Sequence, residues 1–467
     1  MSPRRAAGGQ KTAFQHFHFV YSVRFIQKYL LLTLVPLAQA LLNRQLAAFW
    51  QALRQSAGLL GVLALLALAR GRAAGWRLEA SGCLRLRTGL ALRRQLALPA
   101  GTLAALRLER PPGLRLLGAS ALTLYPARTV RLRPVTLYLS RREAAALAGR
   151  LMPLPAGAAR LRPTRAERLC LALLNANALS SALVLAAAWR QIRALGGWAE
   201  QAARAGLDHA LALAADWLPV RAGWLPAALA ALLAFSLLRS GCDTAFWRLY
   251  VSGPVLAMRG GLLCPTETRI RTAAVTACDI RATPTARLLG RWPVYLAAGS
   301  YRGALPVLLR PGRPDQAGRL AALLPGAVLP DAAPGSARGR SLAACVLWPG
   351  VLAGGALLAL AAASKAAPAL VPALAPAAGA ALTLLAVAWD GRRRERALRA
   401  GGRLTVCTVR RFTLHCWCFF AAPASAHFRQ TPPEAARGRG RLTLAFPAGL
   451  RVRVRSVTRQ AARRALS

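Results

Sequence analysis

The stretch "PTARLLGRWPVYLAAG", residues 284–299, holds an Arg-Leu-Leu-Gly phrase that is followed by alternating apolar residues. The same phrase occurs at residues 115–118, and a weaker version, Arg-Gly-Arg-Gly, occurs at residues 437–440. Glycines at 82, 253 and 402 precede the three phrases at nearly equal spacing. Alternation of this kind is typical of a strand with one buried face. Because a regular repeat is a signal of the fold, the sequence predicts three copies of one β-domain.

The composition combines a high apolar content with a large positive charge. The chain has 467 residues, 55% of them hydrophobic, a mean hydropathy of +0.36 and a formal net charge of +49. Such an apolar content indicates membrane segments, and such a charge attracts anionic lipid or nucleic acid. The nine cysteines are scattered singly, which predicts a reducing, cytoplasmic setting without a disulfide framework.

Apolar runs occur in pairs along the chain, and we expect each pair to form a transmembrane helical hairpin. The runs in the last two pairs are longer than those in the first, which reach the length of a span only if flanking basic residues extend to the interface. The positive-inside rule then places both termini and the three β-domains in the cytoplasm of a multi-pass cell-membrane protein. The six runs are Tyr29–Leu42, Ala57–Ala69, Leu169–Trp189, Trp224–Leu238, Leu342–Ser364 and Ala366–Trp389.

The segments between the hairpins combine strand-like alternation with a helix at the end. In the first of them, Ser140 stands three residues before Glu143 in a capping-box pattern, and an apolar stripe follows. The predicted organisation is a first hairpin at 1–69, a β-domain at 70–166, a second hairpin at 167–240, a β-domain at 241–340, a third hairpin at 341–389 and a β-domain at 390–467.

The first β-domain resembles the bacterial pleckstrin-homology-like (PH-like) domain of the second type. The similarity rests on Gly82 and Leu84, the basic turn Arg93–Arg94, the Leu98–Pro99 pair and the 115–118 phrase. The second copy matches through residues 268–297, and the third matches only in outline. The resemblance implies an α+β membrane protein in which three transmembrane hairpins alternate with three small PH-like split β-barrels, each with a C-terminal helix. It implies no established activity and no catalytic residue.

Alternating arginines suggest the only candidate site. They would form basic ridges on strands near an anionic membrane, although an arginine-rich chain can also present such ridges merely as solvated faces. The candidate lipid-surface residues are Arg85, Arg87, Arg131, Arg133, Arg451, Arg453 and Arg455.

Other chemistry is weakly represented. "HCWC", residues 415–418, raises a metal hypothesis, but structural cysteines are the simpler interpretation. Asp208–His209 is the one adjacent acid and histidine pair, and the polar patch "NANALSS", residues 175–181, could line a solute path or support helix packing. We find no phosphate-binding loop and no nucleic-acid reader module.

The sequence therefore predicts a non-enzymatic interaction or assembly module without cofactor, metal or small-molecule substrate. Its expected partners are membrane lipid and other membrane proteins, and not nucleic acid. The alternative is a transporter, or an accessory subunit of an envelope export or resistance system.

Overall fold

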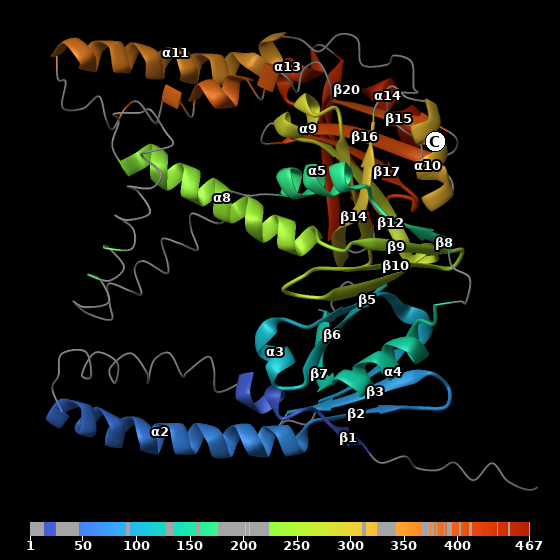
Figure 1. Cartoon of the computed structure of the whole chain (residues 1–467). Coiled ribbons are helices and arrows are strands. Elements are labelled where there is room, and N and C mark those ends of the chain that lie inside the picture. The colour runs from blue at the N-terminus through green and yellow to red at the C-terminus, as the bar shows by residue number, and fades with distance from the viewer. Residues whose placement is uncertain are drawn as a thin grey trace, which may run out of the picture.

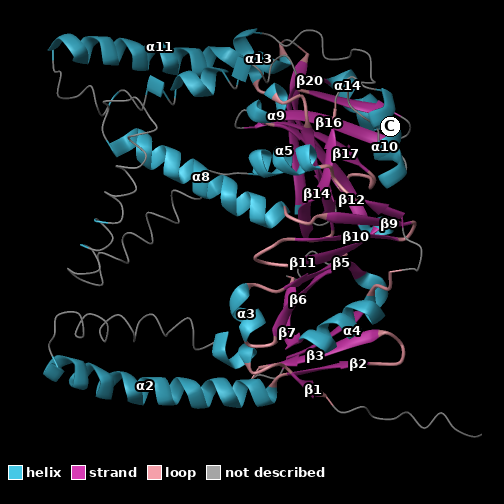
Figure 2. Ribbon diagram, viewed as in Figure 1, coloured by secondary structure: helices cyan, strands magenta, loops and turns pink. Residues whose placement is uncertain are grey.

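We describe a computed structural model of the chain, which consists mainly of four antiparallel β-sheets with helices projecting from them (Figures 1 and 2). The description covers residues 14–24, 46–89, 94–127, 134–154, 159–175, 224–310, 314–324, 342–366, 395–400, 403–410, 413–436, 438–446 and 449–466, with scattered positions in 201–205 and 374–389.

The first and last sheets are the smaller ones. The first sheet has the order β1 (Gln15–His16), β2 (Gly75–Leu78), β3 (Cys83–Thr88) and β4 (Arg94–Pro99). The C-terminal sheet has the order β18 (Ser425–Arg429), β19 (Arg439–Phe446) and β20 (Leu450–Thr458).

The two middle sheets are larger and contain strands from distant parts of the chain. The seven-stranded sheet has the order β7 (Val135–Ser140), β6 (Ala119–Pro126), β5 (Leu103–Glu109), β11 (Thr266–Arg271), β10 (Val255–Gly260), β9 (Arg248–Ser252) and β8 (Ala159–Leu161). The six-stranded sheet has the order β14 (Tyr301–Leu309), β13 (Trp292–Ala298), β12 (Val275–Ala282), β17 (Thr413–Phe419), β16 (Arg403–Arg410) and β15 (Arg396–Ala400).

Edge-to-edge pairing builds these two larger sheets, and it corrects the prediction of three separate PH-like barrels in tandem. Strand β11 pairs with β5, where Thr266 opposes Glu109, and β12 pairs with β17, where Ala277 opposes Phe419. An unpaired edge strand exposes a row of N–H and C=O groups, and pairing with another edge satisfies them. The expected barrels are therefore merged into continuous sheets, and one buried core cluster contains residues as far apart as Ala104 and Cys418.

The Arg-Leu-Leu-Gly phrases differ from the expected strands, because they stand at the C-terminal end of a short helix. Helices α3 (Pro112–Leu116) and α9 (Pro284–Leu288) end in a turn whose glycine, Gly118 or Gly290, has a φ of +69° or +59°. In the third phrase the glycine after α13 (Pro432–Ala435) with this conformation is Gly438, at +61°, and not Gly440. A positive φ favours glycine at this position, and the strand starts only after it.

The capping box at Ser140 forms as its pattern predicts. Helix α4 (Arg141–Leu151) starts with the Ser140 hydroxyl accepting from the Glu143 N–H, while the Glu143 carboxylate accepts from the Ser140 N–H at 3.1 Å. The residues of its apolar stripe, which include Leu147 and Leu151, are buried against the sheet. Helices α10 (Pro314–Leu323) and α14 (Arg459–Leu466) follow β14 and β20.

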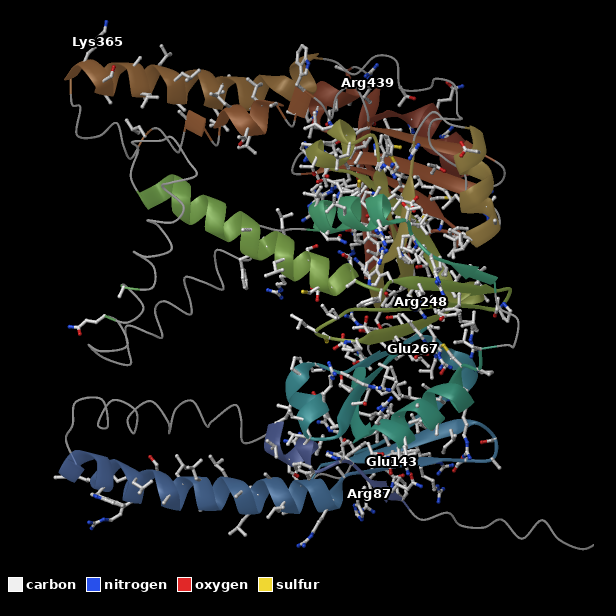
Figure 3. All side chains as sticks on the ribbon, in the orientation of Figure 1. Arg87, Glu143, Arg248, Glu267, Lys365 and Arg439 are labelled. Carbon is white, nitrogen blue, oxygen red and sulfur yellow. The ribbon has the colours of Figure 1, made fainter. Side chains whose placement is uncertain are left out.

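Three long helices, α2 (Leu46–Ala73), α8 (Trp224–Thr244) and α11 (Leu342–Ala366), project from the same side of the sheets (Figure 1). Figure 3 places Lys365 at the end of α11 far from the sheets. Helix α5 (Arg165–Asn175) instead lies beside β14 and α8, with Leu171 buried.

The prediction of three transmembrane hairpins in a multi-pass protein is wrong. Among the described residues, one helix is long and apolar enough to cross a membrane, namely Leu53–Ala73 within α2. The apolar part of α11, Pro349–Lys365, is shorter than the roughly 20 residues that a span needs. The first arm of the second predicted hairpin begins in α5, which packs partly against the sheets. The described helices therefore do not supply six spans.

Candidate functional site: a basic sheet face

The C-terminal sheet has one buried face and one outward face. In β19, Leu442 and Leu444 are buried in a core cluster, and Val452 and Val454 of β20 join them. Because successive residues of a strand point to opposite faces, the residues between these positions lie on the outward face.

Arginines from all three strands lie on that outward face, which we call the basic face. It consists of Arg429 on β18, Arg441 on β19, and Arg451, Arg453 and Arg455 on β20. Arg429 and Arg441 are direct cross-strand partners, and Arg453 opposes Thr443 in the neighbouring pair of strands. Like charges that lie directly opposite one another destabilise a sheet. A local rule broken in this way is typical of a functional surface.

Acidic groups compensate only part of the basic face. The Arg441 Nε atom lies 3.5 Å from Glu434 Oε1, and the backbone N–H of Arg455 donates to Glu395 Oε2 at 3.4 Å. Burial alone would raise the pKa of Glu434, but hydrogen bonds from Thr431 and the charge of Arg441 lower it, so this carboxylate stays ionised. Within the described part of the chain, no ion pair forms at Arg429, Arg451 or Arg453.

The predicted ridge on β3 is occupied by contacts within the chain. Arg85 Nε lies 2.7 Å from Glu79 Oε1, which also accepts from Arg77 at 3.0 Å. Arg87 donates to the carbonyl of Ala73, the last residue of α2, at 3.1 Å. The guanidinium of Arg87 also lies 5.6 Å from the centre of the Phe14 ring. Arg85 therefore stabilises the β2–β3 hairpin, and Arg87 joins the first sheet to α2.

Of the seven arginines singled out by the sequence, the structure brings together Arg451, Arg453 and Arg455. Arg131 and Arg133 lie outside the described residues. Sequence reasoning missed Arg429 and Arg441, because their positions opposite each other depend on the register between β18 and β19. The alternation in "RLTLAF", residues 441–446, was a signal that could have placed Arg441 on an outward face.

A second charged cluster lies on β10 and β11 and contains Glu267, which Figure 3 labels. Glu267 accepts from Arg269 Nη2 at 2.7 Å and from Arg259 Nε at 2.8 Å, and Arg269 Nη1 also donates to the carbonyl of Ala148 in α4 at 3.2 Å. Burial alone would raise the pKa of Glu267, but the hydrogen bonds and charges of both arginines lower it. This cluster therefore ties α4 to the seven-stranded sheet.

A third charged cluster joins β12 to β17 and contains the buried Asp279. Its Oδ2 atom lies 2.6 Å from Arg281 Nε and 3.0 Å from His415 Nδ1. The Arg281 guanidinium stacks 3.6 Å from the centre of the Tyr295 ring, and the Tyr295 hydroxyl donates to Asn175 of α5 at 3.1 Å. Burial raises the pKa of Tyr295, so its hydroxyl stays protonated. Sequence reasoning missed this cluster because Asp279 and His415 are 136 positions apart in the chain.

The cysteines of "HCWC" lie on the face of β17 opposite to His415. Cys416 and Cys418 are buried in the core, where Cys416 Sγ lies 3.3 Å from Cys407 Sγ and Cys418 opposes Cys278. Burial raises the pKa of Cys278 well above its usual value, which keeps that thiol protonated. Because the imidazole and the thiols point to opposite faces, they do not form one set of metal ligands. No group of three or more potential ligands occurs among the described residues.

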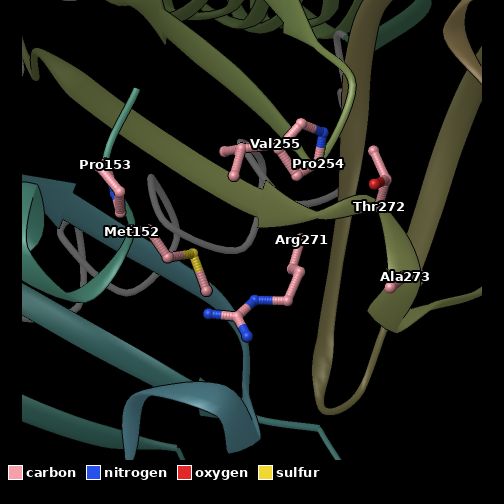
Figure 4. Close-up of a pocket in the computed structure, with 7 residues that line it drawn as sticks. All are labelled: Met152, Pro153, Pro254, Val255, Arg271, Thr272 and Ala273. Atoms are coloured by element: carbon pink, nitrogen blue, oxygen red, sulfur yellow. The ribbon is translucent and has the colours of Figure 1, made fainter. Parts of the chain in front are cut away.

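A pocket of about 470 Å³ lies between the ends of α4 and β10 (Figure 4). Its walls are mainly apolar, and Arg271 is its one charged lining residue. The Arg271 guanidinium donates to the carbonyls of Ala100 and Gly101 at 3.1 and 3.2 Å, so it links β11 to the turn before β5. Seven residues line the pocket, namely Met152, Pro153, Pro254, Val255, Arg271, Thr272 and Ala273, and none of them is a carboxylate, histidine or cysteine.

The residues behind the transporter alternative are mostly not described. Asn175 is the one position of the 175–181 patch within the described residues, and it accepts from Tyr295 as stated above. Asp208 and His209 also lie outside them.

Comparison with known proteins does not extend these observations. No family model, no curated protein and no solved structure matches the chain. The resemblance to the PH-like family therefore stays a prediction from sequence motifs. The described residues form a β-rich structure with one candidate membrane helix and an arginine-covered outward sheet face.

Proposed function

We propose that the chain is a non-enzymatic binding module whose basic face contacts an anionic lipid surface. The observation that carries the proposal is the direct opposition of Arg429 and Arg441 beside Arg451 and Arg453. Folding alone gains nothing from such an arrangement, whereas each basic residue near an anionic membrane contributes about 1 kcal/mol of binding.

Helix α2 favours lipid over nucleic acid as the anionic partner. Its segment Leu53–Ala73 has the length and apolar character of a membrane span, and Val62, Leu65 and Leu68 are more than half exposed. Apolar side chains gathered on a projecting helix require an apolar environment, which a bilayer supplies and a nucleic acid does not.

The proposal is tested by the binding of the full chain, kept in neutral detergent, to nanodiscs. The discs contain phosphatidylcholine alone or phosphatidylcholine with phosphatidylglycerol. The increment, which we define as the ratio of the affinities for the two kinds of disc, measures the effect of anionic lipid separately from any insertion of α2. We expect the increment to be about 30-fold smaller in the R451Q/R453Q variant than in the wild type, because two contacts of about 1 kcal/mol each are removed.

The matched control is R85Q/R87Q, which removes two arginines with partners inside the chain. We expect this variant to keep the increment, and we expect high salt to abolish it in the wild type. Equal affinity of wild type and R451Q/R453Q for the anionic discs would contradict the proposal.

A further inference from the structure

Three pairs of consecutive leucines are exposed at turns of the sheets, and the basic face does not account for them. Leu116 and Leu288, at the ends of α3 and α9, are each 88% exposed, and Leu117 and Leu289 follow them as exposed residues. The third pair, Leu262 and Leu263, lies in the turn between β10 and β11 and is also exposed. Paired large apolar residues at turn tips differ from the single exposed leucines that any protein surface carries.

Local structure fixes the outward direction of the leucines in α3 and α9. In α3, Leu114 is buried against the sheet, and in α9 the buried residue is Ala286. The left-handed glycine that ends each short helix turns the chain back into the next strand. The last two residues before each glycine are therefore held away from the core.

The three turns lie on the side of the molecule from which α2 projects (Figure 1). Hydrogen bonds also connect the α3 turn to the β10–β11 turn, and the β10–β11 turn to α8. The N–H of Leu262 donates to the carbonyl of Cys242 near the end of α8 at 2.8 Å, and the N–H of Arg110, just before α3, donates to the carbonyl of Pro265 at 3.1 Å. The three leucine pairs thus belong to one side of the molecule.

Arginines flank the leucines at the two helical turns. Arg115 precedes Leu116, and Arg287 precedes Leu288. Helix α2 has the same composition at its end near the sheets, where Arg70 and Arg72 follow its apolar segment. An exposed arginine beside leucines, as at Arg115, suits the boundary between acyl chains and headgroups, because the leucines enter the acyl region while the guanidinium group stays at the phosphates. At the second turn, Nε and Nη2 of Arg287 are buried within the chain, so its leucines alone would contact the lipid.

We propose that the three leucine pairs enter the outer acyl region of the bilayer that α2 crosses, and that they fix the side of the sheets that faces the lipid. The inference shares with the proposed function only the presence of a bilayer. It does not depend on the basic face or on anionic lipid.

The turn after α13 provides a matched control within the chain. It ends at Gly438 with the same conformation as Gly118 and Gly290, but Ala436 stands where α3 and α9 have Leu116 and Leu288. The N–H of its glycine donates to the carbonyl three residues earlier, as at the other two turns, and the leucine is missing. Lipid contact through leucine is therefore expected at the first two turns and not at this one.

The test uses the full chain in vesicles of phosphatidylcholine alone, with a photoreactive amino acid placed singly at Leu288, Leu116, Ala436 or Val62 of α2. Each position is exposed or lies on a projecting helix, and a melting curve checks that every variant folds. Lipid adducts are then counted by mass spectrometry. We expect at least about tenfold more adduct at 288 and 116 than at 436, because the proposal places the first two positions in the acyl region and the third outside it.

Adducts at Val62 without adducts at 288 and 116 would overturn the inference while leaving α2 in the membrane. Equal labelling at 436 and 288, or no labelling at any position, would overturn it as well. The basic face is measured by the separate response to phosphatidylglycerol, so the two proposals fail independently.

Discussion

The first sheet and the C-terminal sheet carry the same alternating arginines, but the two sets make different contacts. On β3, Arg85 pairs with Glu79, and Arg87 binds the last carbonyl of α2. On β20, Arg451 and Arg453 face outward beside other arginines. The difference shows that alternation decides which face an arginine occupies, whereas the residues in neighbouring loops and helices decide whether its charge is available to a partner.

The arginines around Glu267 are the extreme case of charges used for folding. The side chain of Arg269 is only 9% exposed, and loss of its carboxylate partner leaves an under-compensated buried charge. We expect E267Q to lower the free energy of unfolding by about 3 kcal/mol, measured by chemical denaturation. If E267Q lowered the free energy of unfolding by less than E143Q, a variant of the exposed capping residue, Glu267 would not be the partner that compensates the buried charge of Arg269.

The same carboxylate gives the wild type a dependence on pH. Because the folded-state pKa of Glu267 is lowered, its contribution to stability is fully present above the pKa of the unfolded chain. That contribution is lost as the pH falls through the folded-state pKa. We therefore expect the free energy of unfolding of E267Q to fall less than that of the wild type as the pH is lowered, measured by chemical denaturation at a series of pH values.

Removal of Glu79 should make the first sheet more like the C-terminal sheet. The E79Q variant leaves Arg77 and Arg85 without their acidic partner. We expect roughly fivefold tighter binding to nanodiscs that contain phosphatidylglycerol, because Arg85, worth about 1 kcal/mol, becomes available, whereas Arg77 keeps its contact with the Phe14 ring. Unchanged affinity would contradict the idea that the partner Glu79 is what separates the two faces.

The smallest expected effect contrasts Arg87 with Arg453 in stability. We expect R87Q to lower the free energy of unfolding by about 1 kcal/mol, since it loses the hydrogen bond to Ala73 and the contact with the Phe14 ring. We expect R453Q to stay within about 0.5 kcal/mol of the wild type. Equal losses in the two variants, measured by thermal unfolding, would remove the contrast.

Local features of the sequence were sufficient where they depend on near neighbours. The Ser140–Glu143 capping box and the outward direction of Arg451 and Arg453 follow from spacings of two to four residues. The Arg-Leu-Leu-Gly phrases were correctly recognised as similar, but the short helices and the glycine at 438 were missed. A five-residue helix gives too few turns for a period of 3.6 to be visible.

Only the tertiary structure decided how the strands combine and which charges remain available. The pairing of β5 with β11 and of β12 with β17 merges the expected barrels. The sequence of an edge strand does not indicate which other strand it pairs with. The expected spans were overestimated because apolar composition does not distinguish a membrane helix from one that packs on a sheet, as α5 does. The sequence by itself determined local conformation and the side to which each strand residue points, because these depend on bonded neighbours. Contacts such as Arg429 with Arg441 or Asp279 with His415 depend on the folded chain, because register and edge pairing bring distant residues together.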